Sequence, residues 1–351
     1  MSIDELYMQR CVDLARGGLG KVSPNPMVGA VVVHNKRIVG EGYHHRYGEA
    51  HAEVHAIQSV KDIWRLREST LYVSLEPCCH HGKTPPCTDL ILENKIPRVV
   101  IGTADPFDAV AGKGIARLRS RGCEVVVGVM KDACRDLNKR FFTFHEKKRP
   151  YIILKWAQTA DGFIDAERVP GAVKRPTWIT SEKLRMLVHK WRTQEPVIMV
   201  GTQTAMKDNP HLNVRDWHGE NPLRIVLDQE LALPANLNLL DNSQPTIIVN
   251  EKIEKTAGST QYWKILFDDL LLDQLMARLY RGNHQSMIVE GGRHLLQSLI
   301  DKNLWDEARI FTGAHFFGKG VPAPVLYEPG NMSYTIIGNE CFYSFTNPGA
   351  A

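Results

Sequence analysis

The sequence lacks an apolar run as long as the roughly 20 residues that span a bilayer, and its first residues are typical of an amphipathic helix, not of a signal peptide. It also lacks a strong charge of either sign. The net charge is +4 over 351 residues, which gives no support to a nucleic-acid-binding surface. The seven cysteines are odd in number and unevenly spaced. We therefore expect a cytoplasmic protein with mostly free thiols and with no membrane or nucleic-acid partner.

Two further absences concern motifs and repeats. The C-terminal half has no G-x-G-x-x-G after a predicted strand, so a Rossmann domain lacks its main support there. No internal repeat links the two halves. The charged segment 145–150 ends in a proline and is typical of a linker. We predict two domains, over residues 1–146 and 150–351.

The first domain has the pattern of a three-layer α/β fold. Ser2 and Glu5 have the spacing of a capping box at the start of a helix. The apolar run 28–33 and the returning segment 37–43 predict a hairpin. Helix and strand patterns then alternate, and one helix is predicted over 131–145. Beyond residue 150, strand and helix patterns again indicate an α/β domain.

The clearest chemical signal consists of "HAE" at 51–53 and "EPCCHHGKTPPC" at 76–87. A catalytic zinc site has three protein ligands and one open position. His51, Cys78 and Cys87 provide such a set. Glu53, two residues after His51, provides a carboxylate that can reach a bound water without binding the metal.

Several alternatives to this metal site stay open. Eight residues separate Cys78 from Cys87, whereas the pattern known for zinc base deaminases is P-C-x-x-C. Cys79 is an alternative ligand. His80 or His81 as a fourth protein ligand would make the zinc purely structural. His55 lies four residues after His51 and could also face the metal.

At these residues the chain resembles the bifunctional deaminase/reductases of riboflavin biosynthesis. The N-terminal half is similar to their cytidine-deaminase-like domain, including the longer insert that ends in "GKTPPC". The C-terminal half is similar to their dihydrofolate-reductase-like domain in "LKWAQTADGFI", "WITSEKLRMLVHKWR", "VGTQTAMKDNPHLNVR" and "VEGGRHLLQSLI". The resemblance covers nearly the whole chain.

The resemblance implies two reactions, two cofactors and a homo-oligomer. Zinc-dependent hydrolysis removes an amine from 2,5-diamino-6-(5-phosphoribosylamino)pyrimidin-4(3H)-one, and NADPH then reduces the ribosyl group, giving 5-amino-6-(5-phosphoribitylamino)uracil. Glu53 would carry protons in the first reaction. Lys155, Asp208 and Glu290 would line the site of hydride transfer, and which of Lys155 and Asp208 is the acid stays open.

The resemblance also implies binding residues for a phosphorylated pyrimidine and for NADPH. Arg192 and Arg215 would hold the ribose phosphate, because guanidinium binds phosphate in a bidentate manner, and the two glycines of "VEGG" would let the backbone approach a pyrophosphate. The implied substrate residues are Asn25, His44, His80, Lys83, Pro176, Arg192, Leu212, Arg215 and Glu290. The implied cofactor residues are Ala157, Trp178, Thr204, Asp208, Gly291 and Gly292.

Two other functions remain in competition at this point. One is a nucleoside or tRNA deaminase with an appended domain, which would favour the short P-C-x-x-C and a basic, aromatic-rich face. The other is a homologue in which one or both halves are inactive. The His51, Glu53, Cys78 and Cys87 set argues against inactivity of the first half, whereas the second half has no comparably sharp marker.

Overall fold

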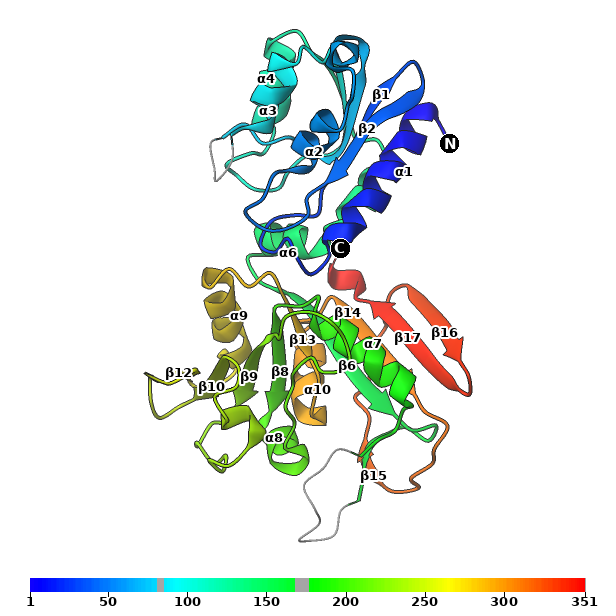
Figure 1. Cartoon of the computed structure of the whole chain (residues 1–351). Coiled ribbons are helices and arrows are strands. Elements are labelled where there is room, and N and C mark those ends of the chain that lie inside the picture. Colours follow the sequence, from blue (N-terminus) through cyan, green and yellow to red (C-terminus); the bar gives the residue numbers. More distant parts are fainter. Residues whose placement is uncertain (81–84, 168–176, 351) are drawn as a thin grey trace. The chain divides into compact units, whose positions relative to one another are not determined.

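The computed structural model describes residues 1–80, 85–167 and 177–350. The chain divides into two compact units, Met1–Lys148 and Arg149–Ala351 (Figure 1). None of the helices in the described ranges is long and apolar enough to cross a membrane.

The first unit is built on a five-stranded sheet with the order β2-β1-β3-β4-β5. β1 runs antiparallel to β2 and β3, whereas β3, β4 and β5 are parallel. The strands are β1 (Gly29–His34), β2 (Arg37–Tyr43), β3 (Thr70–Leu75), β4 (Arg98–Thr103) and β5 (Glu124–Val127). Because the parallel strands end at the same edge, the segments that follow β3 and β4 both start from that edge of the sheet.

Helices cover both faces of this sheet, which confirms the predicted three-layer fold. One face packs on α2 (Ala52–Gln58), α3 (Cys87–Glu93) and α4 (Lys113–Ser120) through Ala56, Ile91 and Leu118. The other face packs on α1 (Ile3–Ala15) and α5 (Lys131–Leu137) through Met8 and Cys134. At the start of α1, Ser2 and Glu5 form the predicted capping box.

The helix predicted over 131–145 is in fact two helices, α5 and α6 (Lys139–Lys147). The break is at Asn138, whose φ of −107° and ψ of 23° leave the helical region. Its buried amide accepts the N–H of Met27 and donates to the carbonyl of Met27, both at 2.8 Å. These two tertiary hydrogen bonds outweigh the helical preference of the flanking residues, and they fix the segment that also carries Asn25.

The second unit is built on a ten-stranded sheet, counted over the described residues, with the order β11-β12-β10-β9-β8-β13-β6-β14-β17-β16. Along the sheet, every strand from β12 through β10, β9, β8, β13 and β6 to β14 runs parallel to its neighbours. β11 is antiparallel at one edge, and the hairpin β16–β17 is antiparallel at the other. The strands are β6 (Tyr151–Gln158), β8 (Val197–Gly201), β9 (Leu223–Leu227), β10 (Thr246–Asn250), β11 (Lys255–Ala257), β12 (Thr260–Lys264), β13 (Ser286–Val289), β14 (Glu307–Thr312), β16 (Met332–Ile337) and β17 (Glu340–Thr346). A separate pair joins β7 (Phe163–Ala166) to β15 (Gly320–Pro322).

Helices again lie on both faces. One core cluster joins the sheet to α9 (Leu271–Arg281) and α10 (Arg293–Asp301), and the other joins it to α7 (Glu182–Arg192) and α8 (Thr202–Asp208). The sequence patterns do not predict β14, because Glu307 and Arg309 interrupt its apolar residues. Both side chains are buried in the structure and form an ion pair at 2.7 Å. A pair of charges that neutralise each other can be buried in a strand where a single charge cannot.

Candidate active sites of the two units

His51, Cys78 and Cys87 come together at the edge of the sheet where β3 ends. His51 is the N-cap residue of α2, Cys78 follows β3 by three residues, and Cys87 is the first residue of α3. Their ligand atoms lie within 4.8 Å of one another, and among the described residues they form the only cluster that could hold a metal ion. The edge of the sheet therefore brings ligands from three segments to one point.

The distances in this cluster fit a tetrahedral zinc ion. His51 Nδ1 lies 3.3 Å from Cys87 Sγ and 3.6 Å from Cys78 Sγ. Zinc bonds of about 2.0 Å to nitrogen and about 2.3 Å to sulfur, at tetrahedral angles, separate these atoms by about 3.5 Å. One imidazole and two thiolates also form the donor set of catalytic zinc sites with three protein ligands. The residues present thus fit zinc.

The two thiols differ in acidity. Hydrogen bonds from Cys87 and His51, together with the backbone N–H of Cys87 at 3.4 Å, lower the pKa of Cys78 to about 4. The pKa of Cys87 is raised, because its proton is shared with Cys78 and because it is buried. Of the two thiols, Cys78 therefore ionises more readily, and the thiolate is the form in which cysteine binds a metal.

Glu53 lies beside this cluster without belonging to it. The side chain is buried, with 3 % of the residue exposed, and it is not among the three potential metal ligands. Burial raises the pKa of its carboxyl group above the ordinary value, while the nearby His51 opposes that shift. The structure therefore places one protonatable carboxyl group within reach of a molecule bound at the three ligands.

The alternative ligands do not join the cluster. Cys79, His80 and His55 are all outside the group of three, and His55 instead stacks on His45 with ring centroids 4.3 Å apart. His81 lies outside the described residues, as does Lys83. Within the described residues, the structural zinc site with four protein ligands is therefore not formed.

Asn25 and His44, two of the predicted substrate residues, are hydrogen-bonded to each other. His44 Nδ1 lies 3.0 Å from the carbonyl oxygen of Ala50, which can only accept, so this nitrogen carries the proton. Burial lowers the pKa of His44, which keeps the ring neutral. Nε2 must then accept, and it takes its hydrogen bond from Nδ2 of Asn25 at 3.1 Å. Because Nδ2 of Asn25 is bound to His44, the orientation of the amide is fixed, and Oδ1 of Asn25 remains available to accept a hydrogen bond from a ligand.

Glu76 is a residue that the sequence patterns did not single out. Its buried carboxylate accepts the backbone N–H groups of Asp105, Gly112 and Ile115 at 3.2, 2.9 and 3.1 Å. It stands two residues before Cys78, so it fixes the position of the strand end from which the first thiolate projects. A carboxylate directly before a Pro-Cys pair could have indicated this role.

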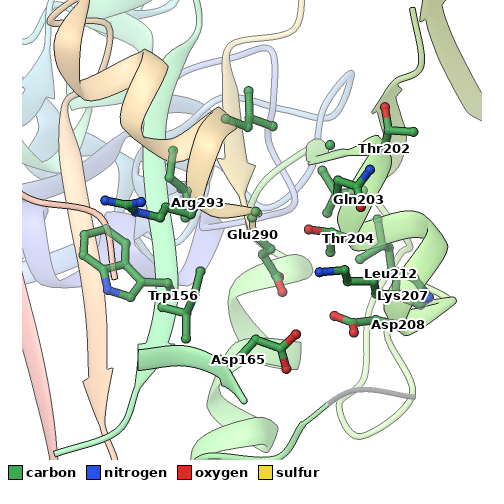
Figure 2. A pocket seen from close by; sticks show the side chains of 18 of the residues that line it. Trp156, Asp165, Thr202, Gln203, Thr204, Lys207, Asp208, Leu212, Glu290 and Arg293 are labelled. Carbon is green, nitrogen blue, oxygen red and sulfur yellow. The ribbon is translucent and has the colours of Figure 1, made fainter. Parts of the chain in front are cut away.

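The second unit contains a cavity of about 1410 Å³ at the carboxyl ends of its parallel strands. Eleven of the predicted residues line it: Lys155, Ala157, Trp178, Arg192, Thr204, Asp208, Leu212, Arg215, Glu290, Gly291 and Gly292. Figure 2 shows Glu290 from one side and Thr204 and Asp208 from α8 facing the same open space. Pro176 lies outside the described residues.

Glu290 is the electrostatic centre of this cavity. Burial alone would raise the pKa of Glu290, but Arg192 and Lys155 outweigh burial and lower it to about 2. Arg192 donates to both carboxylate oxygens at 2.9 Å, and Lys155 Nζ lies 3.7 Å away. Burial lowers the pKa of Lys155, and the charge of Glu290 opposes that change. At the floor of the cavity, the charge of Glu290 thus favours the protonated form of Lys155, and the charge of Lys155 favours the ionised form of Glu290.

Gly291 and Gly292 form a cradle between β13 and α10. A Cβ atom at Gly292 would lie 3.0 Å from Oγ1 of Thr204, and Gly291 has a φ of +129° that favours glycine. Gly292 is also the N-cap residue of the nine-residue helix α10. Backbone N–H groups at a helix start beside a hydroxyl group suit an anion such as a pyrophosphate, so these residues fit a dinucleotide cofactor.

Several other residues of the cavity were not predicted. They include Asp165, which accepts a hydrogen bond from Thr177 at 2.7 Å, as well as Arg185, His189, Lys207 and Arg293. Arg185, His189 and Arg192 are spaced four and three residues apart, so the helical period of α7 could have indicated that they share a face. Arg293 directly follows the two glycines.

The fold and the two sites define a class of protein in which a zinc-dependent deaminase domain precedes a reductase domain. Comparison with protein families agrees with this division. Residues 1–103 match the zinc-binding region of cytidine and deoxycytidylate deaminases, and residues 150–336 match the RibD C-terminal domain.

Individual relatives match nearly the full chain. The riboflavin biosynthesis protein RibD of Aquifex aeolicus is 41 % identical over 325 residues, which is 91 % of this chain and 89 % of the relative. RibD of Bacillus amyloliquefaciens is 38 % identical over 97 % of this chain and 90 % of its own. The crystal structure of a diaminohydroxyphosphoribosylaminopyrimidine deaminase/5-amino-6-(5-phosphoribosylamino)uracil reductase from Thermotoga maritima has a TM-score of 0.86 at 36 % identity, covering 98 % of this chain and 99 % of that chain.

The chain belongs to the RibD family, the bifunctional deaminase/reductases of riboflavin biosynthesis. It is accordingly an enzyme with a hydrolase and an oxidoreductase activity, and its cofactors are Zn²⁺ and NADPH. A tRNA or nucleoside deaminase with an unrelated appended domain does not agree with the match of residues 150–336.

Proposed function

We propose that the unit Met1–Lys148 deaminates 2,5-diamino-6-(5-phosphoribosylamino)pyrimidin-4(3H)-one, and that the unit Arg149–Ala351 reduces the ribosyl group of the product with NADPH. The end product is 5-amino-6-(5-phosphoribitylamino)uracil. The observation that carries the proposal is the three-ligand cluster with Glu53 beside it in one unit, together with a charged cavity and a glycine cradle in the other. The name of the Thermotoga maritima relative supports the choice of substrate.

In the deaminase, the residues of this chain orient the pyrimidine and move protons. His51, Cys78 and Cys87 would hold a zinc ion, which would lower the pKa of a water molecule to about 7 and so make it a nucleophile. The carboxyl group of Glu53 takes one proton from the attacking water and gives it to the ring nitrogen. It then carries the second proton from the newly attached hydroxyl group to the amine, which leaves as ammonia while the carbonyl group forms. Oδ1 of Asn25, directed by His44, accepts an N–H of the pyrimidine. His80 and Lys83 are proposed to contact the substrate on its phosphate side.

In the reductase, the charged floor of the cavity positions the ribosyl group. NADPH supplies the hydride when bound along Ala157, Trp178, Thr204 and the two glycines. Glu290 accepts hydrogen bonds from the ribose hydroxyls. The sugar ring opens by breaking the bond between its anomeric carbon and the ring oxygen, and Lys155 or Asp208 protonates the nitrogen that stays bonded to that carbon as the hydride arrives there. The remaining substrate contacts are proposed for Pro176, Arg192, Leu212 and Arg215.

We also propose that the enzyme works in the cytoplasm as a homo-oligomer. The edge strand β16 supports an association surface, because Met332, Tyr334 and Ile336 point the same way along it and are 55, 60 and 67 % exposed. Light scattering of the purified chain should give at least twice the mass of 39.6 kDa. A monomer at micromolar concentration contradicts this part of the proposal.

A coupled assay with a chelator tests the two-reaction proposal. Ammonia release and NADPH oxidation are followed separately, first on the diaminopyrimidine and then on its deaminated product. We expect zinc removal to stop ammonia release and to leave reduction of the deaminated compound unchanged, because the three ligands lie in one unit and the cavity lies in the other. Ammonia release that persists in zinc-free enzyme would disprove the assignment of the first unit.

A further inference from the structure

The face of α7 that borders the cavity carries Arg185 in addition to Arg192, which is one of the two arginines predicted to hold the phosphate. Arg185, His189 and Arg192 share this face because of their helical spacing, and all three line the cavity together with Arg215. Whether each can serve a phosphate depends on what already neutralises its charge and occupies its N–H groups.

Arg192 is largely committed to the protein. Two of its nitrogens donate to Glu290 at 2.9 Å, and Nη1 donates to the carbonyl oxygen of Asn213 at 2.9 Å. These bonds use three of the five guanidinium N–H groups, and the side chain is only 10 % exposed. Arg192 retains two N–H groups for a ligand, but Glu290, which it shares with Lys155, offsets part of its charge.

Arg215 and Arg185 make longer and more exposed contacts with their acidic neighbours than Arg192 makes with Glu290. The side chain of Arg215 is 44 % exposed, its contact with Asp216 is 3.8 Å long, and its hydrogen bond to Asn213 is 3.4 Å long. Arg185 lies over the ring of Trp178 at 4.3 Å, and its acidic neighbour Glu182 is 3.8 Å away and 83 % exposed. Stacking on an aromatic face leaves the edges of a guanidinium group available as donors.

The charges on this face affect one another. Burial has the largest effect on the pKa of Arg215 and lowers it. The positive charges of Arg192 and Arg185 lower it further, whereas the negative charge of Asp216 raises it. His189 adds no third charge: burial, followed by the charges of Arg192 and Arg215, lowers its pKa to about 4, so the ring is neutral at pH 7. Arg185 and Arg215 therefore repel each other, and a bound dianion would relieve that repulsion.

We propose that Arg185 is a phosphate-binding residue of the reductase. Together with Arg215 it holds the 5′-phosphate of the substrate, and stacking on Trp178 keeps its guanidinium group in position. This inference rests on the proposed function of the second unit. It divides the work of the arginines: Arg192 positions Glu290 and lends single contacts, whereas Arg185 and Arg215 supply the charge that selects a phosphorylated substrate.

The test compares four full-length variants, Arg185→Gln, Arg185→Lys, Arg215→Gln and Lys183→Gln. Lys183 is exposed on the same helix and controls for the loss of one positive charge. Steady-state reduction is measured with the deaminated intermediate, with its dephosphorylated form, and with varied NADPH. Ammonia release in the first unit serves as the check that each preparation is active.

We expect Arg185→Gln and Arg215→Gln each to raise KM for the phosphorylated intermediate about tenfold or more, because each removes a charge-assisted pair. KM for NADPH and kcat/KM for the dephosphorylated compound should change less than about twofold. Lys183→Gln should behave as wild type, and Arg185→Lys should recover part of the loss because it restores the charge.

Two results would overturn the inference. An equal loss on the phosphorylated and dephosphorylated compounds would make Arg185 structural, and a rise in KM for NADPH alone would assign it to a phosphate of the cofactor. Inorganic phosphate gives a measurement that does not depend on variants: it should inhibit wild-type reductase competitively with the phosphorylated intermediate only. Wild-type enzyme that reduces neither compound would instead contradict the proposed function itself.

Discussion

Replacing Glu53 by glutamine should lower ammonia release by a factor of about 10² to 10⁴ and leave the zinc content of the protein unchanged. The amide has nearly the shape of the carboxyl group, and Glu53 is not among the three potential ligands. The glutamine amide, however, cannot take a proton from water and then release it to the substrate. Ammonia production and metal content are measured on the same preparation.

Glu93→Gln is the matched control, because Glu93 makes the same chemical exchange at an exposed position of α3. It should release ammonia at the wild-type rate. NADPH-dependent reduction of the deaminated intermediate should persist in both variants. If Glu53→Gln releases ammonia near the normal rate, another group carries the proton and the assignment of Glu53 is wrong.

The second large effect is expected at Glu290. Glu290→Gln leaves Arg192 and Lys155 as buried cations without their shared partner, and removal of one member of a buried ion pair costs about 3–5 kcal/mol. We expect this loss in urea unfolding of the second unit. Because Glu290 is proposed to position the ribose hydroxyls, we also expect kcat for reduction to fall by about 10² or more. Ammonia release should remain, since the change lies in the other unit.

The lowered pKa of Glu290 predicts how the stability difference between wild type and Glu290→Gln changes with pH. The pKa of Glu290 is about 2 in the folded protein and about 4.3 in an unfolded chain. The folded state therefore favours the ionised form, and this stabilisation is fully present above about pH 4.3. It is lost as the pH falls towards 2, so the stability difference between wild type and Glu290→Gln should shrink over that interval.

A suitable control is Glu220→Gln, at an exposed position of the same unit. Its stability difference from wild type should be small at every pH. A difference between wild type and Glu290→Gln that stays constant from pH 5 to pH 2 would show that Glu290 does not titrate with a depressed pKa.

The metal cluster was predictable from sequence because its members are chemically distinctive and follow elements with clear patterns. His51 starts a helix, Cys78 follows a buried strand, and Cys87 starts the next helix. Parallel strands and their crossover helices bring such positions to one edge of a sheet. The roles of these residues remain predictions until the measurements above are made.

The partners of the predicted residues were not predictable in the same way. Nothing in the sequence near Arg192 indicates that Glu290, 98 residues later, occupies its guanidinium group. Likewise, the hydrogen bond that links His44 to Asn25 depends on where a carbonyl of the loop before α2 lies. Long-range pairing is set by the tertiary fold, so a sequence pattern gives candidate groups but not which of them are already in use.

The contact between Asn138 and Met27 bears on how small a working deaminase can be made. The family match in the first unit ends at residue 103, yet the backbone N–H and carbonyl of Met27, two residues from Asn25, are satisfied by a side chain 111 residues later. A fragment trimmed to the matched region would leave both groups without this partner and would release the loop that carries Asn25, the residue proposed to bind the pyrimidine. An excised catalytic module must therefore retain the junction between α5 and α6.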